Sequence, residues 1–459
     1  MVGFGCVVVL WGVLCCPTLG QGIVERLNIL HQRIGDQIQA GKLDDALQSA
    51  LKGVDIAPRD RYAWGAMAWV RCERREWEET ENAARRALEL GLTDDAAVHY
   101  YLGEALAGQD RLGEAVDAHR QATRLRPEGA VYHDALAIAL CNVDDYEGAV
   151  REHQTAIRLN PQEPEYHFNL SNTLILAPHT TTAEHGAIGA LREAIRLDPE
   201  NPSYRLNLGT LLLASGRADE AVVECLEAAR LNPGDAYYRM GAGNALRDAG
   251  RLDEALEQCR AALRMAPDEW VLQEALAQAC EYAGLGAEAR AGYETMCRLM
   301  AEDPRLPPDY VAQQRGHLAR VRASVGDPEG ALKEARGAVD SAPESPLALE
   351  DLGVVLLISG ETADAEAKFR AALAVEPDRP WAAAGVGWCL AKQGRSEEAR
   401  AQLAAIAGEL SDGGDTPDPR LLVLASNAYA LVGDANRARE LREVVTRRWP
   451  NHLLLKLSP

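Results

Sequence analysis

The sequence predicts an all-α protein built as a stack of antiparallel helix pairs. One small residue recurs at intervals of 34 to 42 residues along nearly all of the 459-residue chain. The apolar residues between these marks follow the period of an α-helix, and no stretch alternates with a period of two for long. Only 5% of the residues are aromatic, so the core must consist mainly of Ala, Leu and Val, which suits closely packed helices.

The first 22 residues form a separate element. Residues 2–19 are uncharged and largely apolar, as in the core of a signal peptide, and Thr18 and Gly20 are small residues suited to cleavage before Gln21. No Lys or Arg precedes this run, however, and its length is marginal for a membrane span. We expect residues 1–22 to be a signal peptide or an N-terminal membrane anchor; a misplaced start or a core helix are the alternatives. The expected location is therefore membrane-associated or exported, with cytoplasmic as the alternative.

A ladder of small residues then defines twelve repeat units. Eleven units carry Ala and one carries Thr at the same place, within the pattern x-E-A or a variant of it. Such internal repetition is the signature of a solenoid, in which each unit buries its apolar face against its neighbours. The ladder residues are Ala46, Thr80, Ala115, Ala149, Ala187, Ala221, Ala255, Ala289, Ala331, Ala365, Ala399 and Ala438.

Other residues keep the same phase as the ladder. Twelve residues after it a proline closes most units, and proline should end the second helix of each pair because it cannot continue a helix interior. Five residues before it a glycine recurs, which allows a turn with positive φ between the paired helices. Twelve residues before it small residues recur, so that two facing helices can approach closely. The prolines are Pro58, Pro127, Pro161, Pro199, Pro233, Pro267, Pro343, Pro377 and Pro450; the glycines are Gly41, Gly216, Gly250, Gly284, Gly326, Gly360, Gly394 and Gly433; the small residues include Gly103, Ala137, Ser171, Gly209, Gly243, Gly353 and Gly387.

These features resemble the tetratricopeptide repeat (TPR) family. The clearest copies are residues 202–235, 236–269 and 346–379, each with an L-G or G-x-G pair, a G-R or G-E turn, a D-E-A or D-A-E-A segment and a terminal proline. The resemblance covers about residues 27–452. It implies a right-handed superhelical α-solenoid whose concave face, lined by the first helices, holds peptides or helices of partner proteins.

Irregular segments divide the array. Four extra residues lie between the helices of the fifth unit, and two further segments have the composition of linkers. Such insertions cost little in short surface loops, so neutral drift explains each, but we expect bends or hinges at the two linkers. The predicted organisation is units one to eight at 23–300, a proline-rich connector at 301–311, units nine to eleven at 312–410, a Gly/Asp/Pro linker at 411–418, and the twelfth unit with the C-terminal end at 419–459.

The first helices of units five to seven carry the candidate binding face. Concave positions lie two to five residues on either side of the small-residue position. Asn is a weak helix former, and its amide both donates and accepts, so several asparagines here could hold the backbone of an extended peptide. Asn169 and Asn207 resemble rungs of the asparagine ladder of O-linked N-acetylglucosamine transferases, which most other units lack. The alternatives are solvated polar residues, or asparagines bonded to a neighbouring helix. The candidate peptide-binding residues are Phe168, Asn169, Asn172, Asn207, Thr210, Tyr237, Met240, Asn244 and Arg247.

The cysteines and histidines predict no metal or cofactor. None of the ten cysteines forms a C-x-x-C pair, and Cys225 and Cys259 are expected to be buried as small apolar residues. His99, His133 and His167 are spaced by 34 residues, but they occupy sites where the family places packing aromatics. We expect packing roles for them and no metal or cofactor.

The remaining composition points to a binding protein. A net charge of −21 disfavours nucleic acid, because there is no basic field to attract phosphates. No H-E-x-x-H, G-x-S-x-G or P-loop motif occurs, so we expect no enzymatic activity and no small-molecule substrate. The predicted function is a non-enzymatic protein–protein interaction scaffold or adaptor with a protein or peptide partner. The alternatives are an accessory subunit of a membrane or cell-envelope assembly (secretion, pilus or polysaccharide export) and a TPR regulator of a separate enzyme.

Overall fold

The computed structural model of the chain consists of helices joined by turns. It describes residues 21–177, 181–301, 305–408, 410, 419–452 and 455. These residues form twenty-four α-helices and no strand, which confirms the predicted all-α class. The predicted linker at 411–418 and nearly all of the predicted N-terminal segment at 1–22 lie outside the described residues.

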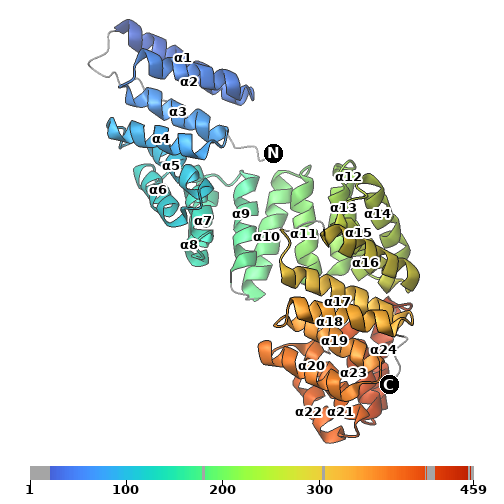
Figure 1. Ribbon diagram of the computed structural model, residues 1–459. Coiled ribbons are helices and arrows are strands. Elements are labelled where there is room, and N and C mark those ends of the chain that lie inside the picture. Colours follow the sequence, from blue (N-terminus) through green and yellow to red (C-terminus); the bar gives the residue numbers. More distant parts are fainter. Residues whose placement is uncertain are drawn as a thin grey trace. The chain divides into compact units, whose positions relative to one another are not determined.

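The chain divides into two compact units, and unit 1 spans Met1–Pro199. Its described residues form five antiparallel helix pairs, in which each helix packs on the next and successive pairs stack side by side (Figure 1). The helices are α1 (Gln21–Gln39), α2 (Leu43–Ile56), α3 (Arg61–Glu73), α4 (Trp77–Glu89), α5 (Ala96–Gly108), α6 (Leu112–Leu125), α7 (Ala130–Cys141), α8 (Tyr146–Leu159), α9 (Pro164–Leu176) and α10 (Thr181–Leu197).

Unit 2 spans Glu200–Pro459 and is built in the same way. Its described residues form seven helix pairs. The helices are α11 (Pro202–Ala214), α12 (Ala218–Leu231), α13 (Ala236–Asp248), α14 (Leu252–Met265), α15 (Trp270–Tyr282), α16 (Gly286–Ala301), α17 (Pro308–Ser324), α18 (Pro328–Ser341), α19 (Pro346–Ile358), α20 (Thr362–Val375), α21 (Pro380–Lys392), α22 (Ser396–Ala405), α23 (Pro419–Leu431) and α24 (Ala435–Arg448). The twelve pairs agree with the twelve predicted units.

The ladder residues lie at the centre of each helix pair. Eleven of the twelve have no exposed area, and Ala438 is 7% exposed. Thr80 stands in place of Ala without leaving its buried hydroxyl unpaired, because Oγ1 donates a hydrogen bond of 2.8 Å to the backbone oxygen of Glu76. The ladder therefore marks the places where only a small side chain fits between the paired helices.

The turns within the pairs adopt the predicted conformation. All eight predicted turn glycines have positive φ, between 69° and 88°. In units two to four the same position is taken by Arg75, Asp110 and Asp144, with φ values of 58°, 62° and 61°. L residues adopt this region at a cost of about 1–2 kcal/mol, so the packing of the two helices overrides the local preference at these three turns.

The second helices end where the prolines predicted. Each of the nine predicted prolines follows the last residue of a second helix by two positions, as Pro233 follows Leu231 of α12. The proline thus ends the helix without occupying its interior.

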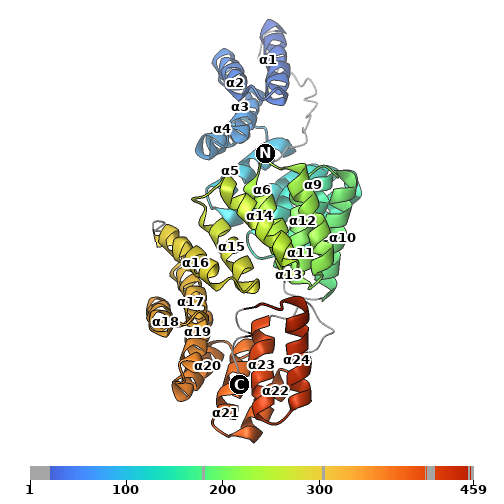
Figure 2. The same ribbon diagram turned by 90° about the vertical axis from the view of Figure 1, so that its right-hand side faces the viewer.

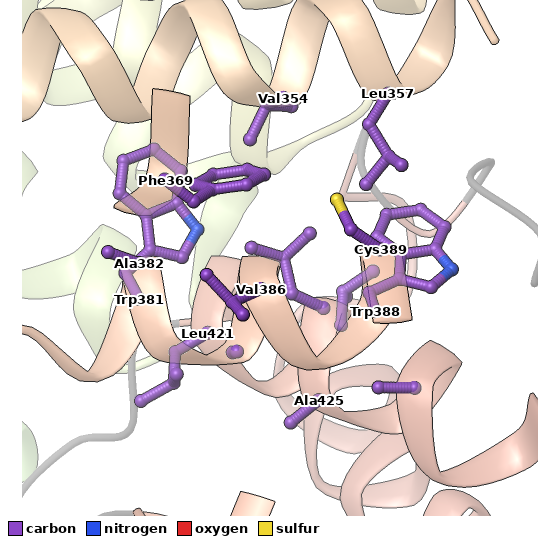
Figure 3. Close-up of a cluster of buried hydrophobic side chains, with 14 of the residues drawn as sticks. Val354, Leu357, Phe369, Trp381, Ala382, Val386, Trp388, Cys389, Leu421 and Ala425 are labelled. Carbon is purple, nitrogen blue, oxygen red and sulfur yellow. The ribbon is translucent and has the colours of Figure 1, made fainter. Parts of the chain in front are cut away.

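Glycines on the first helices admit large side chains from the second helices. The ring of Phe369, on α20, is fully buried between Gly353 of α19 and Gly385 of α21. A Cβ atom would lie 2.9 Å from this ring at Gly353 and 2.6 Å from it at Gly385. Figure 3 shows Phe369 in its cluster, together with Val386 of α21. The predicted close approach of facing helices is therefore confirmed here.

The irregular segments fall between helices. The extra residues of the fifth unit separate α9 from α10, and α17 begins at Pro308, within the connector predicted at 301–311. The predicted linker at 411–418 separates α22 from α23. The division into two units after Pro199 was not predicted, since the repeat continues in phase across it.

Candidate peptide-binding face

The candidate residues lie on the first helices α9, α11 and α13. A side-chain cap fixes where α13 begins, because Asp235 accepts a hydrogen bond of 2.9 Å from the backbone N–H of Tyr237. On the packed side of α13, a Cβ at Gly243 would collide with the Sγ atom of Cys259 on α14. Gly243 therefore faces the second helix; Met240 and Arg247, three residues before it and four after it, lie beside this contact, and Tyr237 and Asn244 lie farther round α13.

On α9, Asn169 hydrogen-bonds to the preceding first helix. Its Nδ2 donates to both carboxylate oxygens of Asp134 on α7, at 3.0 and 3.3 Å. Asp134 also accepts a bond of 2.9 Å from Nδ1 of His153 on α8. Phe168 and Asn172 are half-buried on the same helix. Asn169 thus matches the alternative interpretation of an asparagine bonded to a neighbouring helix. This bond does not test the other candidate peptide-binding residues.

On α11, the two candidate side chains bond to their own helix. Asn207 donates from Nδ2 to the backbone oxygen of Ser203 at 2.8 Å, and Thr210 donates from Oγ1 to that of Leu206 at 2.9 Å. The carbonyl oxygen of the Asn207 amide still has acceptor capacity, and Thr210 is exposed. Both groups can therefore make a second bond to a partner.

Four candidates form one stripe along α13. Tyr237, Met240, Asn244 and Arg247 are spaced by three, four and three residues, which places them on one side of the helix. Tyr237 is 44% exposed, and its hydroxyl donates to Glu269 at 3.3 Å. Met240 and Asn244 are half-buried. The stripe therefore runs from an exposed aromatic residue at the N-terminal end of α13 to a charged residue at its C-terminal end.

Arg247 is engaged within its own chain. Its Nε donates to Asp248 at 2.8 Å, and Nη1 donates to Oδ1 of Asn244 at 3.3 Å and to Oε1 of Gln278. The guanidinium carbon lies 5.3 Å from the ring centre of Tyr282. These contacts fix the Arg247 side chain, which is only 13% exposed, so they leave little of it for a partner.

The C-terminal residues pack on the same place. The indole Nε1 of Trp449 donates a hydrogen bond of 3.0 Å to the backbone oxygen of Arg247, 202 residues earlier in the chain. Trp449 and His452 contact the ring of Tyr282 edge-on, with centroid distances of 5.7 and 4.8 Å. The end of α24 can be followed towards α13 and α15 in Figure 2. Residues 449–452 therefore join the last helix pair of unit 2 to its second and third pairs.

Comparison with known families agrees with this architecture. One tetratricopeptide repeat model matches residues 66–130, 185–236, 240–304 and 318–380, and a second matches residues 356–415. Together they cover more than half of the chain. The chain belongs to the tetratricopeptide repeat family. Its fold supports a general role as a scaffold for interactions between proteins, and proteins of this family are generally not enzymes.

Solved structures with a similar fold include other tetratricopeptide proteins. Pseudomonas aeruginosa PilF has 22% sequence identity, covering 48% of this chain and 97% of that one with a TM-score of 0.41. Yeast Tom70 has 12% identity, covering 91% and 99% of the two chains with a TM-score of 0.45. A chain of the APC/C hetero-tetramer Cut9–Hcn1 has 14% identity, covering 94% of this chain and 95% of that one with a TM-score of 0.41. None of the curated proteins compared matches the chain.

The tetratricopeptide array also contains a buried charge cluster that the sequence analysis missed. Arg320 of α17 is 1% exposed; its Nε lies 2.5 Å from Oδ1 of Asp351, and its Nη1 lies 3.5 Å from Oε1 of Glu281. The Tyr293 hydroxyl donates to Glu281 at 3.1 Å. Burial raises the pKa of Asp351 to about 6, although Arg320 acts in the opposite direction. The sequence held a sign of this cluster, because Glu281 and Asp351 occupy concave positions of first helices in later units and Arg320 directly follows the small-residue position of its own unit.

The histidines take packing and hydrogen-bonding positions in the repeats. His99, His133 and His167 each place Nε2 at the backbone oxygen of the residue six positions earlier, at 3.2, 2.9 and 3.3 Å. His119 and His153 are buried on second helices, four residues after the ladder position. Among the residues that the structure describes, no three His, Cys, Asp or Glu side chains are placed to hold a metal ion.

The described cysteines are free thiols. Cys225 and Cys259 are buried, and desolvation raises their pKa values to about 12 and about 11, so both are protonated at neutral pH. These thiols therefore act as small apolar side chains against the first-helix glycines.

Over the described ranges, no helix combines the length and the apolar character that crossing a membrane requires.

Proposed function

We propose that this tetratricopeptide protein is a non-enzymatic scaffold or adaptor, which binds a peptide or helix of a partner protein along its first helices. The observation that carries the proposal is the stripe on α13. Tyr237 is 44% exposed, and Met240 and Asn244 continue the stripe. Exposed aromatic residues beside adaptable Met and Asn side chains are typical of protein interfaces.

The stripe suits an elongated ligand. Residues three and four positions apart on a helix present a continuous row, which matches the row of side chains on a bound helix or extended peptide. On the neighbouring first helix, Thr210 is exposed and adds a hydroxyl. The partner would thus contact aromatic, thioether and polar groups rather than a closed pocket.

The test begins with the partner. The full-length protein is purified from its native cells, and co-purifying proteins are identified by mass spectrometry. Titration calorimetry then compares binding of the recombinant partner to the wild type, to Tyr237→Ala and to Met240→Ala. We expect Tyr237→Ala to weaken binding about tenfold or more, which corresponds to about 1.4 kcal/mol. Val223→Ala is the matched control, because Val223 is exposed on the second helix α12. Equal affinities of the wild type and both stripe variants would place the contact elsewhere.

A second candidate is an accessory subunit of a membrane or cell-envelope assembly. It rests on the apolar run at residues 2–19, with export or membrane anchoring as the corresponding location. Fractionation of native cells and the mass of the mature N-terminus test it. An intact N-terminus on protein found wholly in the soluble cytoplasmic fraction would reject this candidate and leave the scaffold proposal untouched.

A further inference from the structure

The first helices α5, α7 and α9 of unit 1 carry acidic residues and, apart from one histidine each, no basic ones. None of these three helices contains Lys or Arg. Glu104 lies on α5, Asp134 on α7 and Glu73 on the preceding first helix, α3. We call these three residues the acidic stripe. Of the three arginines within two residues of Glu73, Arg71 and Arg74 are paired with Glu76.

The other two carboxylates of the acidic stripe act on Glu104. Burial, together with the charges of Asp134 and Glu73, raises the pKa of Glu104 to about 7. Burial also raises the pKa of Glu73, which accepts a hydrogen bond of 3.1 Å from Trp69 Nε1. The acidic stripe therefore gathers carboxyl groups whose negative charge is only partly balanced by other side chains of unit 1.

A buried histidine points at the stripe without neutralising it. His119 of α6 is 1% exposed, and its Nε2 lies 3.7 Å from Oε1 of Glu104, beyond hydrogen-bond distance. Its Nδ1 has no hydrogen-bond partner among the described residues. Burial lowers the pKa of His119 to about 4, so the ring is uncharged at neutral pH. Asp134 is better compensated, because it accepts bonds from His153 and Asn169. Glu104 is thus the carboxylate with the weakest compensation.

Exposed aliphatic side chains lie on the same face. Ile138 occupies the position equivalent to Glu104 in the next unit, 34 residues later, and is 45% exposed. Asn172 occupies it in the following unit, and Ile175 and Leu176, 40% and 60% exposed, come three and four residues after Asn172. Large aliphatic side chains gathered on one exposed face indicate an interaction surface.

We propose that the first-helix face of α5, α7 and α9 docks a partner segment that combines Lys or Arg with large aliphatic residues. A basic group of the partner pairs with Glu104 and Glu73, while its aliphatic side chains cover Ile138, Ile175 and Leu176. The charge complementarity sets the sign of the partner, and the aliphatic residues exclude a small cation as the whole ligand. The inference rests on the proposed scaffold function and gives the chemistry of one of its ligands.

The energetics favour such a segment. A guanidinium or ammonium group beside Glu104 forms charge-assisted hydrogen bonds and relieves the repulsion between the three carboxylates. Covering the aliphatic side chains adds about 25 cal/mol per Å² of apolar surface removed from water. An acidic segment of the same size would meet repulsion on this face, which gives the surface its specificity.

The experiment uses the full chain and two labelled synthetic peptides of equal length, one alternating Leu with Lys and the other Leu with Glu. Fluorescence anisotropy gives their Kd values. We expect the Lys peptide to bind and the Glu peptide not to bind. Glu104→Gln, which keeps the shape of the side chain, should weaken binding of the Lys peptide about tenfold, and Glu73→Gln should weaken it by a smaller factor. Leu176→Ser tests the aliphatic contact and should weaken binding several-fold.

Glu147→Gln is the matched control, since Glu147 lies on the second helix α8 and its side chain is 94% exposed. It removes the same charge and should change the Kd by less than about twofold. Equal binding of both peptides, or equal effects of Glu104→Gln and Glu147→Gln, would overturn the inference. Unchanged far-ultraviolet circular dichroism checks that each variant is folded. If the native partner binds through α13 but Glu104→Gln leaves the Kd of the Lys peptide unchanged, this inference fails and the proposed function stands. If the Lys peptide behaves as expected but no native partner contacts a first helix, the proposed function fails.

Discussion

Replacing Gly385 by Ala tests the close helix packing on which the repeat depends. In the wild type, Phe369 fills the space between Gly353 and Gly385 and has no exposed area. A Cβ on Gly385 would lie 2.6 to 2.7 Å from three atoms of the Phe369 ring, where at least about 3.4 Å is normal. The ring is rigid and enclosed, so the backbone of α21 or α20 must shift.

Two effects of opposite sign contribute to the change in stability. Alanine is the better helix former by about 1 kcal/mol, which favours the variant. Overpacking of a close-packed core costs about 1–3 kcal/mol, and the contact here is at the severe end because no side of the ring is open. We therefore expect Gly385→Ala to lower the free energy of unfolding of unit 2 by about 1–2 kcal/mol.

Urea unfolding followed by far-ultraviolet circular dichroism measures this change. Gly189→Ala on α10 is the control, because a Cβ there meets nothing within 4 Å; it should raise stability by up to about 1 kcal/mol. Phe369→Leu should rescue Gly385→Ala, so that the double variant is more stable than the sum of the two single effects by about 1 kcal/mol or more. A Gly385→Ala protein as stable as the wild type would refute the packing argument.

Three further perturbations probe the turns, a buried histidine and the C-terminal contact. Arg75→Gly should raise the free energy of unfolding by about 0.5–1 kcal/mol, because it removes an L residue held at φ 58°. Gly360→Ala, at φ 85° in open space, should lower the free energy of unfolding by a similar amount. Both changes are measured as shifts of the urea midpoint, and equal midpoints would mean that these turns are not strained. Burial lowers the pKa of His119 from 6.5 to about 4, so between these values the folded state binds fewer protons than the unfolded state; the contribution of His119 to stability is complete above pH 6.5 and falls, by up to about 3 kcal/mol, as the pH drops towards 4. Burial also lowers the pKa values of His31 and His317, so urea unfolding of His119→Leu should show a smaller loss of stability over this range than the wild type, and an equal loss would contradict the assignment. Trp449→Ala should release the C-terminal end from α13 and α15, seen as faster hydrogen exchange at Gly284 and at the end of α13, while unchanged protection there would show that Trp449 does not hold this contact.

The periodic part of the architecture could be read from the sequence. The ladder, the turn glycines and the closing prolines each act within about 34 residues, through a helix end, a turn or the contact of two successive helices. Such interactions repeat with the chain, so residue type and spacing suffice to predict them. Burial of Ala221 and positive φ at Gly216 follow in this way from one unit alone.

The candidate face was predicted only as a set of positions. Helical geometry places Tyr237 and Met240 on one side of α13, and the structure agrees. The partners of these side chains were not predictable: Asn169 bonds to Asp134, and Arg247 bonds to Gln278, each on a neighbouring first helix. Which rotamer reaches which neighbour depends on how far one helix pair is rotated relative to the next, and the repeat pattern does not specify that rotation.

The fold class, the number of helix pairs and the residues at their contacts depend on local periodicity and were therefore predictable from the residues alone. The division after Pro199, the burial of Arg320 between Glu281 and Asp351, and the bond from Trp449 to Arg247 became known only from the folded chain. These features arise from small rotations that accumulate over many units, so residues about 200 positions apart meet without any mark in the repeat that pairs them.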